Sequence, residues 1–307
     1  MPAVRGQFDH LLAPGARKVF VDEYQELPSI YNRVFNVDTS GRAWEDDLVM
    51  TGLPVATKRG EGEPIAFDRP FFRGRVRYIH TGFGLGYEIT KEAVDDDVYG
   101  ALNSQGATNL AWSMREAEEI TAWNVFNNSF TSVQAYDGVS LLNTAHPGIG
   151  DLEFSNRPET PQDLSVAALK AATERFFLMR TDRGLRIRMG PSTLVVPTQN
   201  WWTAQELLGT QVRTFDSGEG DPMDSLEGRN VVTQMGLTPL QSQYITDEGA
   251  WWLVANKGVH KLNFFWRERP NDESGYDGRN RLSWFAIVGR WVAGATDWRG
   301  IDGSPGT

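Results

Sequence analysis

The sequence contains no cysteine and only 4 histidines, and both shortages exclude particular chemistries. Without cysteine there can be no disulfide and no thiolate metal ligand, and a reducing cytosol is the simplest compartment for the chain. None of the histidines has a partner at the spacing of a zinc site or a catalytic triad. The sequence also lacks a P-loop and the G-x-S-x-G motif of serine hydrolases. We therefore expect no enzymatic activity, no metal and no cofactor.

Long hydrophobic runs are missing as well. No segment approaches the roughly 20 apolar residues that cross a bilayer, and residues 1–6 lack the apolar core of a signal peptide, so we expect no membrane partner. Basic charge is in deficit, because 30 Lys and Arg face 40 Asp and Glu, for a formal net charge of −10. That balance argues against gripping nucleic acid through a broad basic face. The charge does not exclude a surface that faces nucleic acid without binding it tightly.

Large apolar side chains, in contrast, are plentiful. The 307 residues are 40% hydrophobic and include 11 tryptophans. A globular chain of this length forms one elaborate domain or two lobes with their own cores. Tryptophan is favoured in buried contacts and in protein–protein interfaces. Helical and strand-like patterns both occur, and they predict an α+β fold.

Residues 90–130 predict one long helix around which the chain is organised. Thr90 is a candidate N-cap, and the acidic Asp95 and Asp96 complement the unpaired amide groups of the first turns. Apolar residues then recur at helical spacing and predict a buried stripe. The stripe consists of Leu110, Met114, Ala117, Thr121 and Val125.

Two tryptophans predict a second apolar face on this helix. Trp112 and Trp123 lie about three turns apart and therefore share a face away from the stripe. Glycines and β-branched residues weaken the first half and favour a break near residues 103–106. The remaining surface is expected to be filled by Glu116, Glu118 and Glu119.

Before the helix, the sequence predicts an arm and a hairpin. Residues 1–50 are expected to be an extended arm, with a short amphipathic helix at 18–27 that carries Phe20 and Tyr24. This helix docks either on another molecule or on its own domain; the pattern favours neither. Residues 51–89 are expected to form a long hairpin with an irregular Pro- and Gly-rich tip.

Arg73, Arg75 and Arg77 alternate in this hairpin, so they share one face of a strand. Such a face is either a solvated surface or a contact with an acidic partner, such as the carboxylate-rich helix of another copy. On the second interpretation, charge reversal impairs assembly while leaving the subunit folded.

Two motifs that resemble sites are interpreted as structural. The glycines of residues 82–86 do not match the G-x-G-x-x-G spacing, and we expect them to permit close packing. His146 precedes a proline in a loop and is expected to be a hydrogen-bonded structural residue.

The second half of the chain alternates helices, strands and polar loops. We expect helices at 163–181 and 197–209, strands at 185–189, 193–196, 230–232, 251–255, 259–266 and 281–294, and polar loops at 210–228 and 270–280.

In this order the segments resemble the major capsid protein of tailed bacteriophages, which has the Hong Kong 97-type fold, in the subgroup of Mu-like heads. The resemblance covers essentially the whole chain through loose motifs. They lie at residues 19–24 with 27–28, 84–92, 137–147, 194–197 with 204–208, and 296–300.

The resemblance implies a homo-oligomer of hexamers and pentamers that forms an icosahedral shell around double-stranded DNA, assembled in the host cytoplasm and located in the virion. It implies an N-terminal arm (1–50), an extended hairpin loop (51–89), a spine helix with a peripheral domain (90–209), an axial domain (210–280) and a returning strand with the C-terminus (281–307). Scaffolding, portal and decoration proteins are implied partners, with the scaffold a separate or removed chain.

Candidate subunit-interface residues follow from this resemblance. Some relatives crosslink a loop lysine to a neighbour's asparagine; Lys58 is the only lysine of the hairpin, and no signature marks an asparagine partner. The candidates are Phe20, Tyr24, Lys58, Arg73, Arg75, Arg77, Asp95, Asp96, Trp112, Glu116, Glu119 and Trp123.

Two alternatives remain open from the sequence. An encapsulin-type nanocompartment shares the fold but holds enzyme cargo, and neighbouring genes would separate the two. A Trp-rich glycan-binding protein or glycosidase would instead be a discrete monomer that binds sugars.

Overall fold

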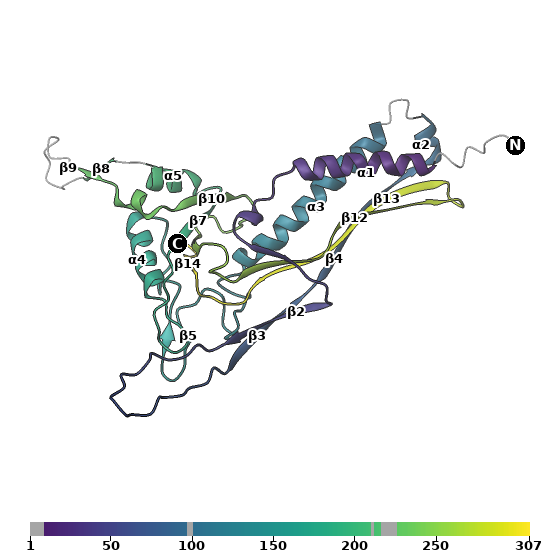
Figure 1. Cartoon of the computed structure of the whole chain (residues 1–307). Coiled ribbons are helices and arrows are strands. Elements are labelled where there is room, and N and C mark those ends of the chain that lie inside the picture. Colours follow the sequence, from purple (N-terminus) through teal and green to yellow (C-terminus); the bar gives the residue numbers. More distant parts are fainter. Residues whose placement is uncertain (1–8, 97–100, 210–211, 216–225) are drawn as a thin grey trace. The chain divides into compact units, whose positions relative to one another are not determined.

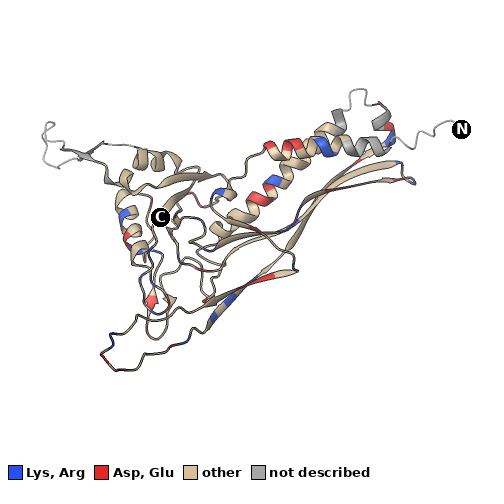
Figure 2. Ribbon diagram, viewed as in Figure 1, with Lys and Arg blue, Asp and Glu red and all other residues tan. Residues whose placement is uncertain are grey.

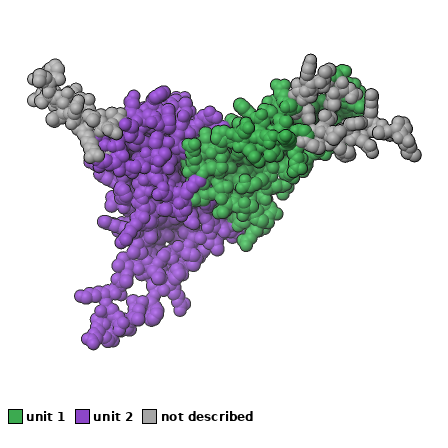
Figure 3. Space-filling view, turned by 45° about the horizontal axis from the view of Figure 1, so that its top comes forward, with its two compact units in different colours: residues 1–45, 78–122, 264–293 green, residues 46–77, 123–263, 294–307 purple. Residues whose placement is uncertain are grey.

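The structure, a computed structural model of the chain, describes residues 9–96, 101–209, 212–215 and 226–307 (Figure 1). The chain divides into two compact units, coloured in Figure 3. Unit 1 comprises residues 1–45, 78–122 and 264–293, and unit 2 comprises residues 46–77, 123–263 and 294–307. Segments far apart in the sequence therefore build each unit. None of the helices described in these ranges is long and apolar enough to cross a membrane.

Unit 1 combines helices with one sheet. Its helices are α1 (Asp9–Glu26), the single-turn η2 (Tyr31–Arg33), α2 (Lys91–Asp96) and most of α3 (Ala101–Asn127). Its sheet has the order β1-β12-β13-β4. The strands are β1 (Asn36–Thr39), β4 (Thr81–Thr90), β12 (Leu262–Asp277) and β13 (Leu282–Ala295).

The predicted long helix is represented by α2 and α3; its start after Thr90 is confirmed, whereas the break predicted near residues 103–106 was wrong. Residues up to Thr90 belong to β4, where the Thr90 hydroxyl accepts from the Ala93 amide at 3.2 Å and so caps α2 as predicted. Helix α3 runs through Gly106 without a break, because this glycine has a packing role. A Cβ there would lie 2.8 Å from the ring of Tyr87 in β4.

The stripe on α3 is confirmed at three of its five residues, with Ala117 and Thr121 half-buried, whereas the tryptophan face is not. Leu110, Met114 and Val125 are all buried, at 3%, 2% and 4% exposure. Trp123 is fully buried but Trp112 is 60% exposed, so the two tryptophans do not share an environment.

The glycines of β4 allow close strand packing, as expected. Gly86 lies opposite Ala286 in the antiparallel register of β4 and β13. A Cβ at Gly86 would lie 2.8 Å from that of Ala286. The segment is thus a strand with a crowded neighbour.

Unit 2 is organised around the sheet β10-β7-β11-β14, in which β10 and β7 are parallel and the other pairs antiparallel. All five residues of β11 are buried, as a central strand requires. The strands are β7 (Pro191–Pro197), β10 (Thr238–Ser242), β11 (Trp251–Ala255) and β14 (Ile301–Ser304). The remaining elements are α4 (Val166–Leu178), α5 (Trp201–Gly209), η3 (Val231–Met235), and the strand pairs β2 (Trp44–Met50) with β3 (Phe72–Ile79), β5 (His146–Pro147) with β6 (Glu153–Phe154), and β8 (Val212–Phe215) with β9 (Leu226–Arg229).

Helix α4 spans residues 166–178 and so begins three residues later and ends three residues earlier than predicted; the Ser165 side chain caps it by accepting from the Ala168 amide at 3.2 Å. Three other expectations were wrong. Residues 185–189 hold a single bridge rather than a strand, residues 230–232 begin the 3-10 helix η3, and the polar segment 270–280 lies largely in the hairpin of β12 and β13. Polar residues in an exposed hairpin resemble a loop in composition, which explains the last error.

The extended hairpin also differs in its limits. It starts at Trp44 rather than at residue 51, and residues 81–90 pair with β13 instead of continuing the hairpin. The five-part division into arm, loop, spine, peripheral and axial parts stays a prediction.

Candidate functional site

The most conspicuous candidate is the segment that joins β2 to β3, called here the extended loop (residues 51–71). Figure 1 shows it as a thin loop projecting from the two strands. Its base is closed by two hydrogen bonds: the Thr51 amide donates to the Phe71 carbonyl, and the Phe71 amide donates to the Thr51 hydroxyl, each at 3.0 Å. Between these residues the chain forms no helix or strand, and residues 52–71 are all exposed.

The extended loop exposes large apolar side chains. Leu53 is 54% exposed, Val55 69%, Ile65 62% and Phe67 92%. Single exposed apolar residues are ordinary, but several on one short loop mark an interaction surface. These side chains gain a buried environment only by contact with another surface.

The arginines of β3 have acidic partners within their own chain. Arg77 binds Asp46 of β2 in a bidentate pair, with both nitrogen–oxygen distances 2.7 Å, and Arg75 lies 3.8 Å from the same carboxylate. Figure 2 shows the basic residues of β3 beside the acidic residues of β2. The hydrogen bond from Arg77 holds the pKa of Asp46 below its ordinary value.

Arg73 turns to a different part of unit 2. Its Nη2 donates to the carbonyls of Pro147 and Gly148 at 2.8 and 2.9 Å, and its Nε lies 3.9 Å from Asp182. The acids that the structure places beside these arginines belong to the same subunit. A contact of this face with the acidic surface of another copy stays a prediction. The run Glu45-Asp46-Asp47, just before the predicted hairpin, was the sequence signal for them.

A second cluster lies in unit 1, where α3 holds the segment around α1. Glu118 accepts from the hydroxyls of Tyr24 and Tyr31 and pairs with Arg115 at 2.7 Å. The Arg115 guanidinium also donates to the Tyr24 carbonyl at 2.9 Å. Glu119 accepts from the amides of Ile30 and Tyr31, which lie just after α1.

Both glutamates correct the sequence analysis, which placed them on the surface. Glu118 is 0% exposed and Glu119 1% exposed. Burial raises the pKa of Glu118, and Arg115 opposes the rise. Burial, followed by the nearby Glu118 carboxylate, also raises the pKa of Tyr24. These carboxylates therefore fix the arm to its own subunit.

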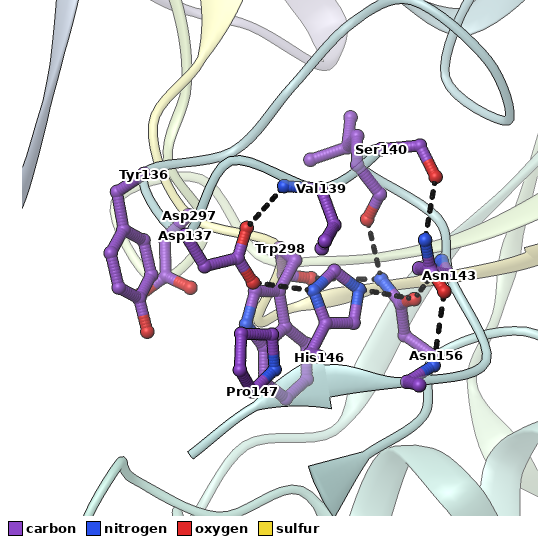
Figure 4. A network of polar contacts seen from close by, with 12 residues as sticks. Tyr136, Asp137, Val139, Ser140, Asn143, His146, Pro147, Asn156, Asp297 and Trp298 are labelled. Carbon is purple, nitrogen blue, oxygen red and sulfur yellow. Dashed lines mark hydrogen bonds and ion pairs between the residues drawn. The ribbon is translucent and has the colours of Figure 1, made fainter. Parts of the chain in front are cut away.

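His146 is a buried structural residue, as predicted (Figure 4). Its Nδ1 lies 2.7 Å from Asp137 Oδ2, and its Nε2 lies 3.0 Å from the side-chain oxygen of Asn156. The side-chain nitrogen Nδ2 of Asn156 donates to the Leu141 carbonyl at 2.9 Å, and this bond keeps the side-chain oxygen of Asn156 directed toward the histidine. The ring stacks on Trp298 with centroids 4.4 Å apart.

The described residues offer no metal centre, because no three His, Asp or Glu side chains among them are grouped to hold an ion.

The predicted interface residues fall into three sets. Phe20, Glu119 and Trp123 are buried in their own chain and present no side chain to another copy. Tyr24 and Arg73 are partly buried, and the side chain of Asp95 lies outside the described residues. Lys58, Arg75, Arg77, Asp96, Trp112 and Glu116 are exposed and stay interface predictions.

Comparison with known proteins gives the family. The chain matches the family model described as phage capsid protein over residues 78–301. This match spans more than half of the chain, and the protein therefore belongs to the phage capsid protein family. No curated protein matches it.

Solved structures agree with this family. The chain is similar to the capsid of a native GTA particle (14% identity, 90% of each chain, TM-score 0.56). It is also similar to a virus-like particle from Pyrococcus furiosus (10% identity, 94% of this chain and 97% of that one, TM-score 0.52) and to Mycobacterium phage Adephagia (12%, 91% and 90%, TM-score 0.52). At these identities the likeness shows the fold, which is the Hong Kong 97-type fold.

Fold and family together define the class of protein. The chain is a structural major capsid protein, a subunit of the shell of a phage head. The family therefore favours a shell subunit over the glycan-binding alternative.

Proposed function

We propose that copies of this chain assemble as hexamers and pentamers into an icosahedral shell around double-stranded phage DNA. In this proposal the extended loop of one subunit lies on the surface of a neighbouring copy. Assembly takes place in the host cytoplasm with scaffolding and portal proteins, and the subunit itself catalyses no reaction.

The observation that carries the proposal is the extended loop. More than half of the surface of each of its apolar side chains Leu53, Val55, Ile65 and Phe67 is left uncovered by the described residues, with Phe67 the most exposed at 92%. Burying apolar surface contributes about 25 cal/mol per Å², so exposed residues of this kind favour association. A stable interface buries about 1,600 Å² in total, and a projecting loop reaches a neighbour without distorting either compact unit.

The net charge of the chain suits a shell that encloses DNA rather than a protein that binds DNA tightly. A net charge of −10 gives packaged DNA no strong general attraction to the subunit. DNA that must leave the head again is held by confinement and not by many phosphate contacts.

The proposal is tested by size-exclusion chromatography with negative-stain electron microscopy on the purified protein, alone and with the products of its neighbouring genes. We expect closed shells or capsomer-sized rings. The double variant Ile65→Asp/Phe67→Asp should remain monomeric with an unchanged unfolding temperature, whereas the exposed-loop control Glu61→Gln should assemble.

Two results would overturn the proposal. One is a wild-type chain that stays monomeric under every assembly condition. The other is normal assembly of the double aspartate variant, which would show that the apolar tip of the loop is not an interface.

A further inference from the structure

The returning limb of the extended loop, residues 68–73, is held by one short turn after α4. Arg183 in this turn contacts three residues of the limb. Its Nη1 pairs with the carboxylate of Asp68, its Nη2 donates to the Arg69 carbonyl at 3.1 Å, and its guanidinium lies 5.3 Å from the centre of the Phe71 ring. The Arg183 side chain is only 14% exposed although the limb itself is exposed.

The preceding residue of the turn, Asp182, receives the end of the same limb. Arg73 lies 3.9 Å from this carboxylate. Asp182 is itself fixed inside unit 2, because it accepts from Arg299 at 2.8 Å and from the Tyr136 hydroxyl at 2.7 Å. Adjacent residues of opposite charge thus bind two places on one limb.

The turn is well suited to act as a fixed support. The Gly184 amide donates to the Thr181 carbonyl at 2.8 Å, and Gly184 has φ +80°, a conformation that glycine adopts without strain. The Leu185 amide donates to the Thr181 hydroxyl at 3.2 Å. Arg183 therefore lies inside a turn that these two hydrogen bonds close.

We propose that Arg183 is the positioning residue of the extended loop, which sets the direction in which the apolar tip leaves the subunit. A single exposed ion pair contributes little, but Arg183 combines an ion pair, a hydrogen bond and a ring contact on residues 68–71. These contacts of Arg183 with residues 68–71, called here the clamp, lie within one chain. The role of the clamp in directing the loop to a neighbouring copy rests on the proposed function.

The absence of cysteine allows a direct test by spin labelling. Nitroxides are placed at Thr57→Cys in the loop and Glu174→Cys on the exposed side of α4, and their distance is measured by double electron–electron resonance. Labelled chains are diluted with unlabelled chains so that only distances within a chain are read. The parent should give one narrow distribution.

Two variants remove the clamp from opposite sides. Arg183→Gln and Asp68→Asn should each broaden or shift the distribution, and the double variant should add little to either single variant. Arg188→Gln is the matched control, because Arg188 is an exposed arginine in the same connection with no ion pair among the described residues. An unchanged distribution in Arg183→Gln would overturn the inference.

Assembly of the same variants separates this inference from the proposed function. If the parent forms shells and Arg183→Gln forms fewer or misshapen ones, the clamp directs the loop. If Arg183→Gln changes the distance but the parent never assembles, the clamp stands and the proposed function fails. If the parent assembles while the distance is unchanged in Arg183→Gln, the clamp fails alone.

Discussion

Gly74 of β3 lies so close to Tyr136 that a Cβ on this glycine would be 2.4 Å from the Tyr136 carbonyl oxygen. The oxygen belongs to the backbone, so no side-chain rotation can relieve the contact. The Tyr136 amide in turn donates to the Thr296 carbonyl at 2.9 Å, which holds this segment in place. The base of the extended loop therefore depends on a residue without a side chain.

Gly74→Ala should destabilise the subunit. Overpacking costs about 1–3 kcal/mol, and here the neighbour is a fixed backbone atom. Chemical denaturation should show this loss, whereas Gly52→Ala, at a position where a Cβ meets nothing within 4 Å, should stay close to wild type. Equal stability of both variants would contradict the close approach.

Glu118→Gln should weaken the attachment of α1. The substitution leaves Arg115, whose side chain is 15% exposed, without its carboxylate partner. Removing one member of a buried ion pair costs roughly 3–5 kcal/mol. Denaturation measures the stability, and proteolysis near residues 15–28 reports the arm. The neighbouring exposed Glu116→Gln should change stability by less than about 0.5 kcal/mol; a similar loss in both would show that Glu118 has no special role.

His146→Ala should destabilise unit 2. It leaves the Asp137 carboxylate, which is 0% exposed, without the imidazole, and it removes the stacking partner of Trp298. Leaving a buried hydrogen-bonding group without its partner costs about 1–3 kcal/mol. Thr144→Ala, on the exposed part of the same loop, serves as the control in thermal unfolding. A His146→Ala subunit as stable as this control would contradict the network.

The base of the hairpin should loosen in acid. The hydrogen bond from Arg77 lowers the pKa of Asp46 in the folded chain below its unfolded value of about 3.9. The contribution of this pair is therefore fully present above that value and is lost as the pH falls through the lowered pKa. The difference in unfolding free energy between wild type and Asp46→Asn should be constant near neutral pH and shrink in acid.

The exposed Asp38→Asn provides the comparison for this titration, since Asp38 makes no ion pair among the residues described. A difference between wild type and Asp46→Asn that grows on acidification would contradict the assigned direction.

Local patterns predicted much of the fold because they depend on neighbours along the chain. The alternation of Arg73, Arg75 and Arg77 correctly placed a strand, and the buried stripe with Leu110 and Met114 correctly placed α3. The structural role of the loop histidine His146 was also predicted correctly, because the lack of partners at the spacing of a metal site or a triad can be seen in the sequence itself.

The errors concern partners distant in sequence. Glu118 reads as a surface residue on a helix, and its partner Tyr24 lies 94 positions away. Gly106 reads as a helix breaker because the ring of Tyr87 that needs its space belongs to another element. Arg183 carried no signal, since its role appears only when the turn and the loop meet.

The central claim is that the extended loop binds a neighbouring copy, and photocrosslinking from Phe67 tests it most directly. Benzoylphenylalanine replaces Phe67, which is 92% exposed, and assembled particles are irradiated and analysed by denaturing electrophoresis and mass spectrometry. We predict covalent dimers joined between position 67 of one copy and the surface of another, absent from unassembled subunits. Crosslinks confined to a single chain in assembled particles would contradict the account.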